Sequence, residues 1–77
     1  MQIQKSGLAY ELESEIIITM YYIDSLEELL GGNSVGNLTK LIDGYLDIEN
    51  YLACEGIKKA IDKYKQIQEN NEIKKGI

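Results

Sequence analysis

Apolar residues in the first third of the chain follow the spacing of a helix. Residues three and four apart share one side of a helix. One such stripe consists of Ala9, Leu12, Ile16, Thr19, Ile23, Leu26 and Leu30. Residues 15–23 are rich in β-branched and aromatic side chains, which also suit a strand, but strong helix formers flank them. The pattern predicts a helix over about 8–30 with Ser6 as its N-cap, and a strand over 15–23 is the competing interpretation.

Glycine and asparagine residues interrupt this pattern between residues 31 and 37. Glycine readily ends a helix in the left-handed conformation, and Asn37 can cap the helix that follows. The second periodic segment comprises Leu38, Leu41, Ile42, Tyr45, Ile48, Leu52, Ala53, Ile57, Ala60, Ile61, Tyr64 and Ile67. It predicts a long helix over about 38–70, which Gly56 could bend or split. Residues 1–7 and 71–77 are expected to be flexible.

The two segments together predict an all-α, single-domain chain over residues 1–77. A short loop between two long helices gives an antiparallel helical hairpin. The first helix, however, is apolar on nearly every side around its middle, and such a helix is normally buried all round. We therefore expect two hairpins to dimerise into a four-helix bundle, with a monomeric three-helix bundle split at Gly56 as the alternative. The expected interface residues are Ile16, Ile17, Met20, Tyr21, Tyr22 and Ile23.

The charges divide the chain into an acidic and a basic part. The sequence has 13 acidic residues and 8 lysines, no arginine, and a net charge of −5. Residues 1–55 hold 10 acids and 2 lysines, net −8, and residues 56–77 hold 3 acids and 6 lysines, net +3. The acidic part suits a basic protein surface, as in a small regulator or inhibitor from a phage or other mobile element. The lysines from Lys58 to Lys75 could contact nucleic acid in an antitoxin-like role, which the overall acidity and the lack of arginine disfavour.

Few residues in the sequence suit catalysis. The chain has no histidine and a single cysteine, which excludes imidazole-based triads, cysteine-rich zinc sites and intramolecular disulfides. Cys54 follows Tyr51-Leu52-Ala53 and is expected to be a small buried apolar residue. Asp43 and Asp47 share a helix face and precede Glu49 and Glu55, but a solvated acidic face is a stronger interpretation than a Mg²⁺ or Ca²⁺ site. We expect no catalytic residue, no metal and no cofactor, and hence no enzyme.

No segment has the pattern of a signal peptide or of a membrane span. The longest apolar stretch, residues 16–23, is interrupted by Thr19 and is far shorter than the roughly 20 residues that a span needs. We therefore expect a cytoplasmic protein without membrane partners, or one exported without a cleavable signal.

Residues 23–46 resemble the small WXG-type helical hairpins associated with type VII secretion. That family places a tryptophan at the end of the first helix, a glycine two residues later, a small residue after two more, and an aromatic four further on. The corresponding residues here are Leu30, Gly32, Ser34 and Leu38. Tyr45 lies where that family has a further aromatic residue in the second helix. The export motif of the family, a tyrosine followed four residues later by an acid, is incomplete because Tyr64 is followed by Gln68. The resemblance implies a non-enzymatic hairpin that pairs with itself or with another helical protein.

Overall fold

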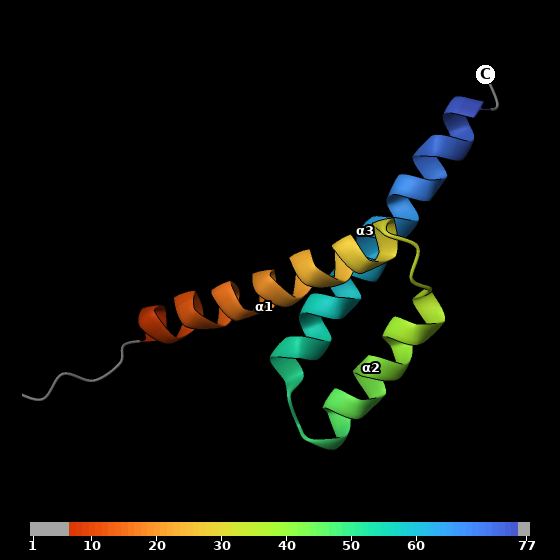
Figure 1. The fold of residues 1–77 in the computed structure, drawn as a ribbon. Helices are drawn as coiled ribbons and strands as arrows, with labels where there is room; N and C mark the ends of the chain where they lie inside the picture. The colour runs from red at the N-terminus through yellow and green to blue at the C-terminus, as the bar shows by residue number, and fades with distance from the viewer. Residues whose placement is uncertain (1–6, 76–77) are drawn as a thin grey trace, which may run out of the picture.

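Three α-helices joined by two short loops form the described part of the chain (Figure 1). The computed structural model describes residues 7–75, with the side chains of residues 9–71. Helix α1 spans Gly7–Leu30, α2 spans Val35–Asp47 and α3 spans Tyr51–Lys75. The described residues contain no strand, so the all-α prediction is confirmed and residues 15–23 are helical. Ser6, the expected N-cap, lies outside the described residues.

The loop between α1 and α2 is a glycine turn followed by a serine cap. Gly32 adopts a left-handed φ of 111°, which glycine tolerates without a steric penalty. The Asn33 amide donates to the Glu28 carbonyl at 2.9 Å, as in a Schellman motif. Ser34, rather than the expected Asn37, is the N-cap of α2, and its Oγ accepts from the Asn37 amide at 3.0 Å.

The predicted long helix over 38–70 is wrong, because a second turn separates α2 from α3. Glu49 has a left-handed φ of 60°, and the Asn50 amide donates to the Tyr45 carbonyl at 2.8 Å. The Asn50 side-chain oxygen then accepts from the Ala53 amide at 3.2 Å. Asn50 thus closes one helix with its backbone and caps the next with its side chain. The sequence shows no glycine here, which is why the periodic pattern looks continuous.

Gly56 lies inside α3 and does not split it. A Cβ at this position would lie 2.5 Å from the Ile18 carbonyl oxygen and 2.6 Å from the Tyr21 Cβ of α1. The missing side chain therefore lets the backbones of α1 and α3 approach closely where they cross. Helix α3 then continues to Lys75, so the backbone of residues 71–75, expected to be flexible, is helical.

Helix α3 is the central element, because α1 and α2 both pack mainly against it. Figure 1 shows α2 and α3 side by side in opposite directions, while α1 crosses α3 and runs towards the same end of the molecule. The antiparallel pair is therefore α2 with α3, instead of the first helix with a long second one. The N-terminal part of α1 and the C-terminal part of α3 extend in opposite directions, and the molecule measures 63 × 28 × 15 Å.

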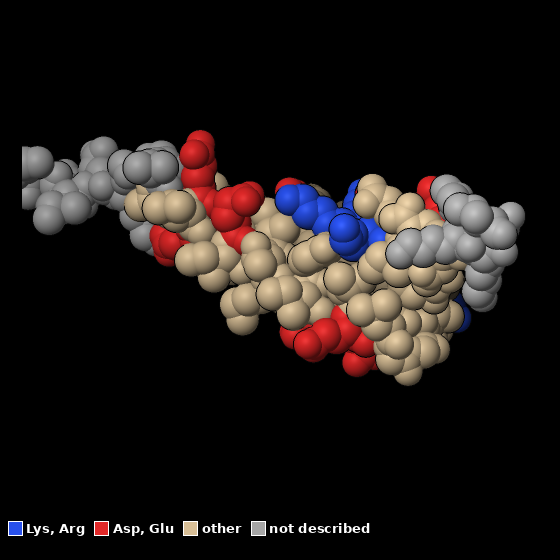
Figure 2. Space-filling model, turned by 90° about the horizontal axis from the view of Figure 1, so that it is seen from above, with Lys and Arg blue, Asp and Glu red and all other residues tan. Residues whose placement is uncertain are grey.

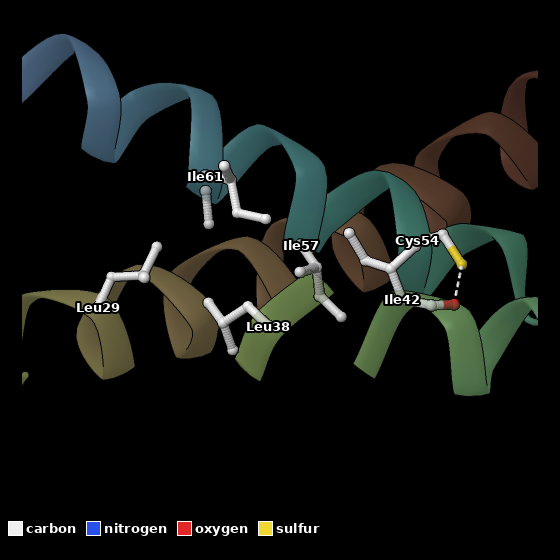
Figure 3. Packing of buried hydrophobic residues seen from close by; sticks show 7 residues of the cluster. Leu29, Leu38, Ile42, Cys54, Ile57 and Ile61 are labelled. Atoms are coloured by element: carbon white, nitrogen blue, oxygen red, sulfur yellow. Dashed lines mark hydrogen bonds between the residues drawn. The ribbon is translucent and has the colours of Figure 1, made fainter. Parts of the chain in front are cut away.

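The hydrophobic core lies where the three helices meet (Figure 3). Its buried residues are Leu29, Leu38, Ile42, Cys54, Ile57, Ala60 and Ile61. The Cys54 thiol lies among them and donates to the Ile42 carbonyl oxygen of α2 at 3.5 Å. The expectation of a small buried cysteine is confirmed, and its thiol ties α3 to α2.

Candidate interaction surface

One side of α1 packs against α3, and we call it the inner face. It consists of Ile18, Tyr22, Ser25 and Leu29, which follow one another at four, three and four residues. Ile18 is 5% exposed and Leu29 is 1% exposed, while Tyr22 is half-buried against the core. Ser25 is small enough to be buried between larger neighbours. The inner face therefore holds α1 to the rest of the fold.

The opposite side of α1 is apolar and exposed, and we call it the outer face. It consists of Leu12, Ile16, Met20 and Ile23, and within it Ile16 is 61% and Ile23 48% exposed. Three of these residues belong to the stripe that the periodicity selects, so much of the stripe expected to pack lies in solvent, whereas Leu26 of that stripe packs against the core. The reason is that α1 is apolar around most of its circumference, and periodicity then cannot identify the packed side. The close approach of α1 and α3 at Gly56 determines which side of α1 is packed.

The six expected interface residues divide into two groups. Ile16, Ile17, Met20 and Ile23 are exposed. Tyr22 and Tyr21 are half-buried, the first on the inner face and the second beside α2. The ring of Tyr21 meets that of Tyr45 edge-on, with centroids 5.6 Å apart and planes at 75°. Partial burial raises the pKa of the Tyr45 hydroxyl, and the neighbouring Tyr21 adds to the shift.

Charged side chains follow one edge of α1, and we call Glu11, Glu15, Lys59 and Lys63 the charged edge. Lys59 of α3 lies beside Thr19 of α1, and Lys63 follows one turn later on the same side of α3. Glu11 and Glu15 line a depression with Ile18 of the inner face and with Glu55 of α3, so they lie on the side of α1 that faces α3. Figure 2 shows acidic side chains over the N-terminal half of α1 and lysines over the region where α1 and α3 cross. One edge of the molecule thus has a negative and a positive section.

A shallow apolar hollow borders the outer face on its other side. It has a volume of about 550 Å³ and opens to solvent. Its lining residues are Ile17, Met20, Tyr21, Asp24, Asn50 and Leu52. The hollow joins the outer face at Met20, so an apolar partner covering that face would also find room for a side chain here.

The turn residues that carry the WXG-type resemblance have different surroundings. Leu38 is buried in the core, Gly32 supplies the left-handed turn, and Ser34 caps α2. Leu30, at the tryptophan position of that pattern, is 59% exposed, and its neighbour Leu29 packs in the core cluster with Leu38 instead. The leucine that packs in the core with Leu38 is therefore Leu29, one residue before the tryptophan position of that pattern.

The described carboxylates do not gather into a metal-binding group. Asp43, Asp47 and Glu49 are exposed, and Glu55 pairs with Lys59 at 3.9 Å. Within residues 7–75, no group of three or more acidic, cysteine or histidine side chains is placed to hold a metal ion. None of the described helices combines the length and the hydropathy that crossing a bilayer requires. Comparison with known family models, curated proteins and solved structures finds no match to this chain.

Proposed function

We propose that this chain is a non-enzymatic helical interaction module whose outer face on α1 is covered by another protein. The observation that carries the proposal is the exposure of four large apolar side chains in one continuous stripe. Contiguous exposed apolar surface of this kind marks interaction sites on soluble proteins, whereas isolated exposed leucines do not. The occupant is a second copy, giving a helical bundle of two chains, or another helical protein that α1 caps.

The energetics of the outer face support this function. Burying a leucine, isoleucine or methionine side chain fully contributes about 1.5–3 kcal/mol relative to leaving it in water. The fold forgoes about half of this gain at Ile16, Met20 and Ile23, although a chain of this length has a small core. A partner that covers the stripe recovers it. The WXG-type resemblance supports the same interpretation, since that family pairs helical hairpins with one another.

The buried thiol supports a non-enzymatic role. Cys54 is the strongest potential nucleophile in the chain, but it lies in the core and donates to the Ile42 carbonyl. A cysteine in this position serves packing, because a reactive thiol needs partial exposure and a neighbouring cation.

The test is a comparison of two paired substitutions in the cells that produce the protein. Ile16→Glu with Ile23→Glu places two charges on the outer face. The matched control, Leu41→Glu with Leu46→Glu, makes the same change at exposed leucines of α2. Fluorescence-detected sedimentation of the labelled chain in extract should show wild type and control above the monomer mass of 8.7 kDa and the outer-face variant at that mass. Assembly lost in the control and kept in the outer-face variant would refute the proposal.

A second candidate function follows from the exposed acids of α1. Glu11, Glu15 and Asp24 are exposed on α1, and they would suit a partner with a basic surface, such as the target of a small phage-encoded or mobile-element regulator. Such binding weakens steeply with salt, because exposed charges are screened within about 10 Å at 0.1 M ionic strength. Binding in extract that persists unchanged at high salt favours the apolar interaction module over this candidate.

A further inference from the structure

We infer that the outer face is covered by a helix of another protein, and that this helix carries lysine or arginine beside an apolar stripe. The stripe packs on the outer face, and the basic side chains lie opposite Asp24 and Glu27 of α1. The inference rests on the proposed function and names the chemistry of its partner. It follows from the carboxylates that adjoin the outer face and from the separation of apolar and basic surface within the chain.

Two exposed carboxylates adjoin the outer face at its C-terminal end. Asp24 follows Met20 by one turn, and both residues line the apolar hollow. Glu27 follows Ile23 by one turn, so it continues the outer face towards the end of α1. Asp24 and Glu27 also line a second depression, which α1 shares with α2. A partner that covers Met20 and Ile23 therefore meets both carboxylates.

These two carboxylates are not neutralised within the chain. Among the described side chains, no lysine lies within ion-pair distance of Asp24 or Glu27. Helix α1 has no basic residue of its own. Lys59 of α3 lies beside Thr19 of α1, but it pairs with Glu55 at 3.9 Å. This end of the outer face is therefore negative, which favours a partner with basic side chains there and disfavours one with acidic side chains.

A second copy lacks a surface that fits this one. Its exposed apolar stripe lies on α1, where every charged side chain is a carboxylate. Apart from Lys40 of α2, the lysines of the described helices lie on α3, and no large apolar side chain among residues 52–71 is exposed. Two joined outer faces would bring carboxylates from both chains together with no lysine of either α1 to offset them. The combination of exposed apolar and basic groups must come from a different chain.

The shape of the outer face suits a helix. From Leu12 to Glu27 it extends over about 22 Å, at 1.5 Å per residue. Its apolar side chains are spaced by four, four and three residues, and such a row packs between the side chains of a second helix. The hollow beside Met20 gives room for one further apolar side chain of that helix. An amphipathic helix with a basic flank thus matches the stripe, the hollow and the negative end.

Two designed peptides test this chemistry on the purified full chain. Each has about 18 residues, enough for a helix as long as the outer face, with leucines along one side. The positions beside the leucines hold lysine in one peptide and glutamate in the other. Fluorescence anisotropy of the labelled peptides should show that the lysine peptide binds at least about tenfold more tightly than the glutamate peptide. Ile16→Ser with Ile23→Ser should weaken the binding of both peptides, because it removes apolar contacts.

Reversing the two carboxylates should reverse this preference. In Asp24→Lys with Glu27→Lys, the lysine peptide should bind at least about tenfold more weakly than to wild type, and the glutamate peptide more tightly. The matched control, Asp43→Lys with Asp47→Lys, makes the same change in net charge at exposed acids of α2. It should leave both affinities within about twofold of wild type. Circular dichroism checks that every variant retains its helices.

Three results would overturn the inference. The first is equal binding of the two peptides, or no binding of either. The second is an unchanged preference in the charge-reversed variant, because Asp24 and Glu27 then do not meet the partner. The third is self-association of the purified wild type that Ile16→Ser with Ile23→Ser removes, because a second copy is then the occupant. In each case the sedimentation of the outer-face variant in extract still decides the proposed function separately.

Discussion

The two faces of α1 have similar side chains and opposite surroundings. The inner face holds Ile18 and Leu29 against α3, and the outer face leaves Ile16 and Ile23 in solvent. Composition does not explain the difference, because both faces have large aliphatic residues at helical spacing. The difference arises at α3, where Gly56 admits the inner face at close range. A helix that is apolar on both sides therefore packs with one side within the fold, and we propose that the other side serves association.

The largest expected effect is a difference in the free energy of unfolding between substitutions at two adjacent leucines. Leu29 is 1% exposed in the core, and Leu30 is 59% exposed at the end of the same helix. Leu29→Ala should lower the free energy of unfolding by about 2–5 kcal/mol, because it removes core contacts and leaves a cavity. Leu30→Ala should change it by less than about 0.5 kcal/mol. Urea unfolding followed by circular dichroism measures both, and equal losses would contradict the assignment of the two faces.

Alanine substitutions at two glycines, Gly56 and Gly44, test the close approach of α1 and α3. Gly56→Ala forces a methyl group towards the Ile18 carbonyl and should destabilise the fold by about 1–3 kcal/mol. A methyl group added at Gly44 of α2 would have no neighbour within 4 Å, so Gly44→Ala should stabilise by about 0.5–1 kcal/mol through helix propensity. Thermal unfolding of both variants shows the opposite signs. A stabilising Gly56→Ala would mean that α1 does not approach α3 there.

The smallest expected effect on the isolated chain concerns the outer face. Ile16→Ser should change the unfolding free energy of the dilute monomer by less than about 0.5 kcal/mol, because the side chain already lies in solvent. If the occupant is a second copy, the wild-type Tm should rise with protein concentration, and Ile16→Ser should remove that rise. A dilution series by differential scanning fluorimetry measures this. A large loss at the lowest concentration would place Ile16 in the core of the single chain.

Much of the fold can be predicted from the sequence, but the packed side of α1 cannot. The first helix, its glycine stop and the buried Cys54 follow from spacing and turn chemistry. The break at Asn50 does not, since Glu49 takes a left-handed conformation that favours glycine and interrupts an otherwise continuous pattern. Asn50 itself is the missed signal, because asparagine is a strong N-cap residue.

The candidate interaction surface can also be predicted from the sequence only in part. The sequence indicates that α1 has more apolar side chains than one hairpin can bury, and it names Ile16, Met20 and Ile23 among them. It does not show that Tyr21 and Tyr22 turn towards the other helices, because that depends on where α3 crosses. The close approach at Gly56 is a property of two segments far apart in the chain. Local periodicity carries no information about it.

The most direct test of the outer face is site-specific photo-crosslinking in the cells that produce the protein. A benzophenone amino acid replaces Ile16 in one variant. In the other it replaces Lys40, which lies on α2 opposite the buried Leu38 and Ile42. Irradiation should give one discrete adduct from position 16, at about twice 8.7 kDa if the second copy is the occupant, and none from position 40. Absence of an adduct at position 16, or the same adducts from both positions, would contradict the assignment of the outer face as the interaction surface.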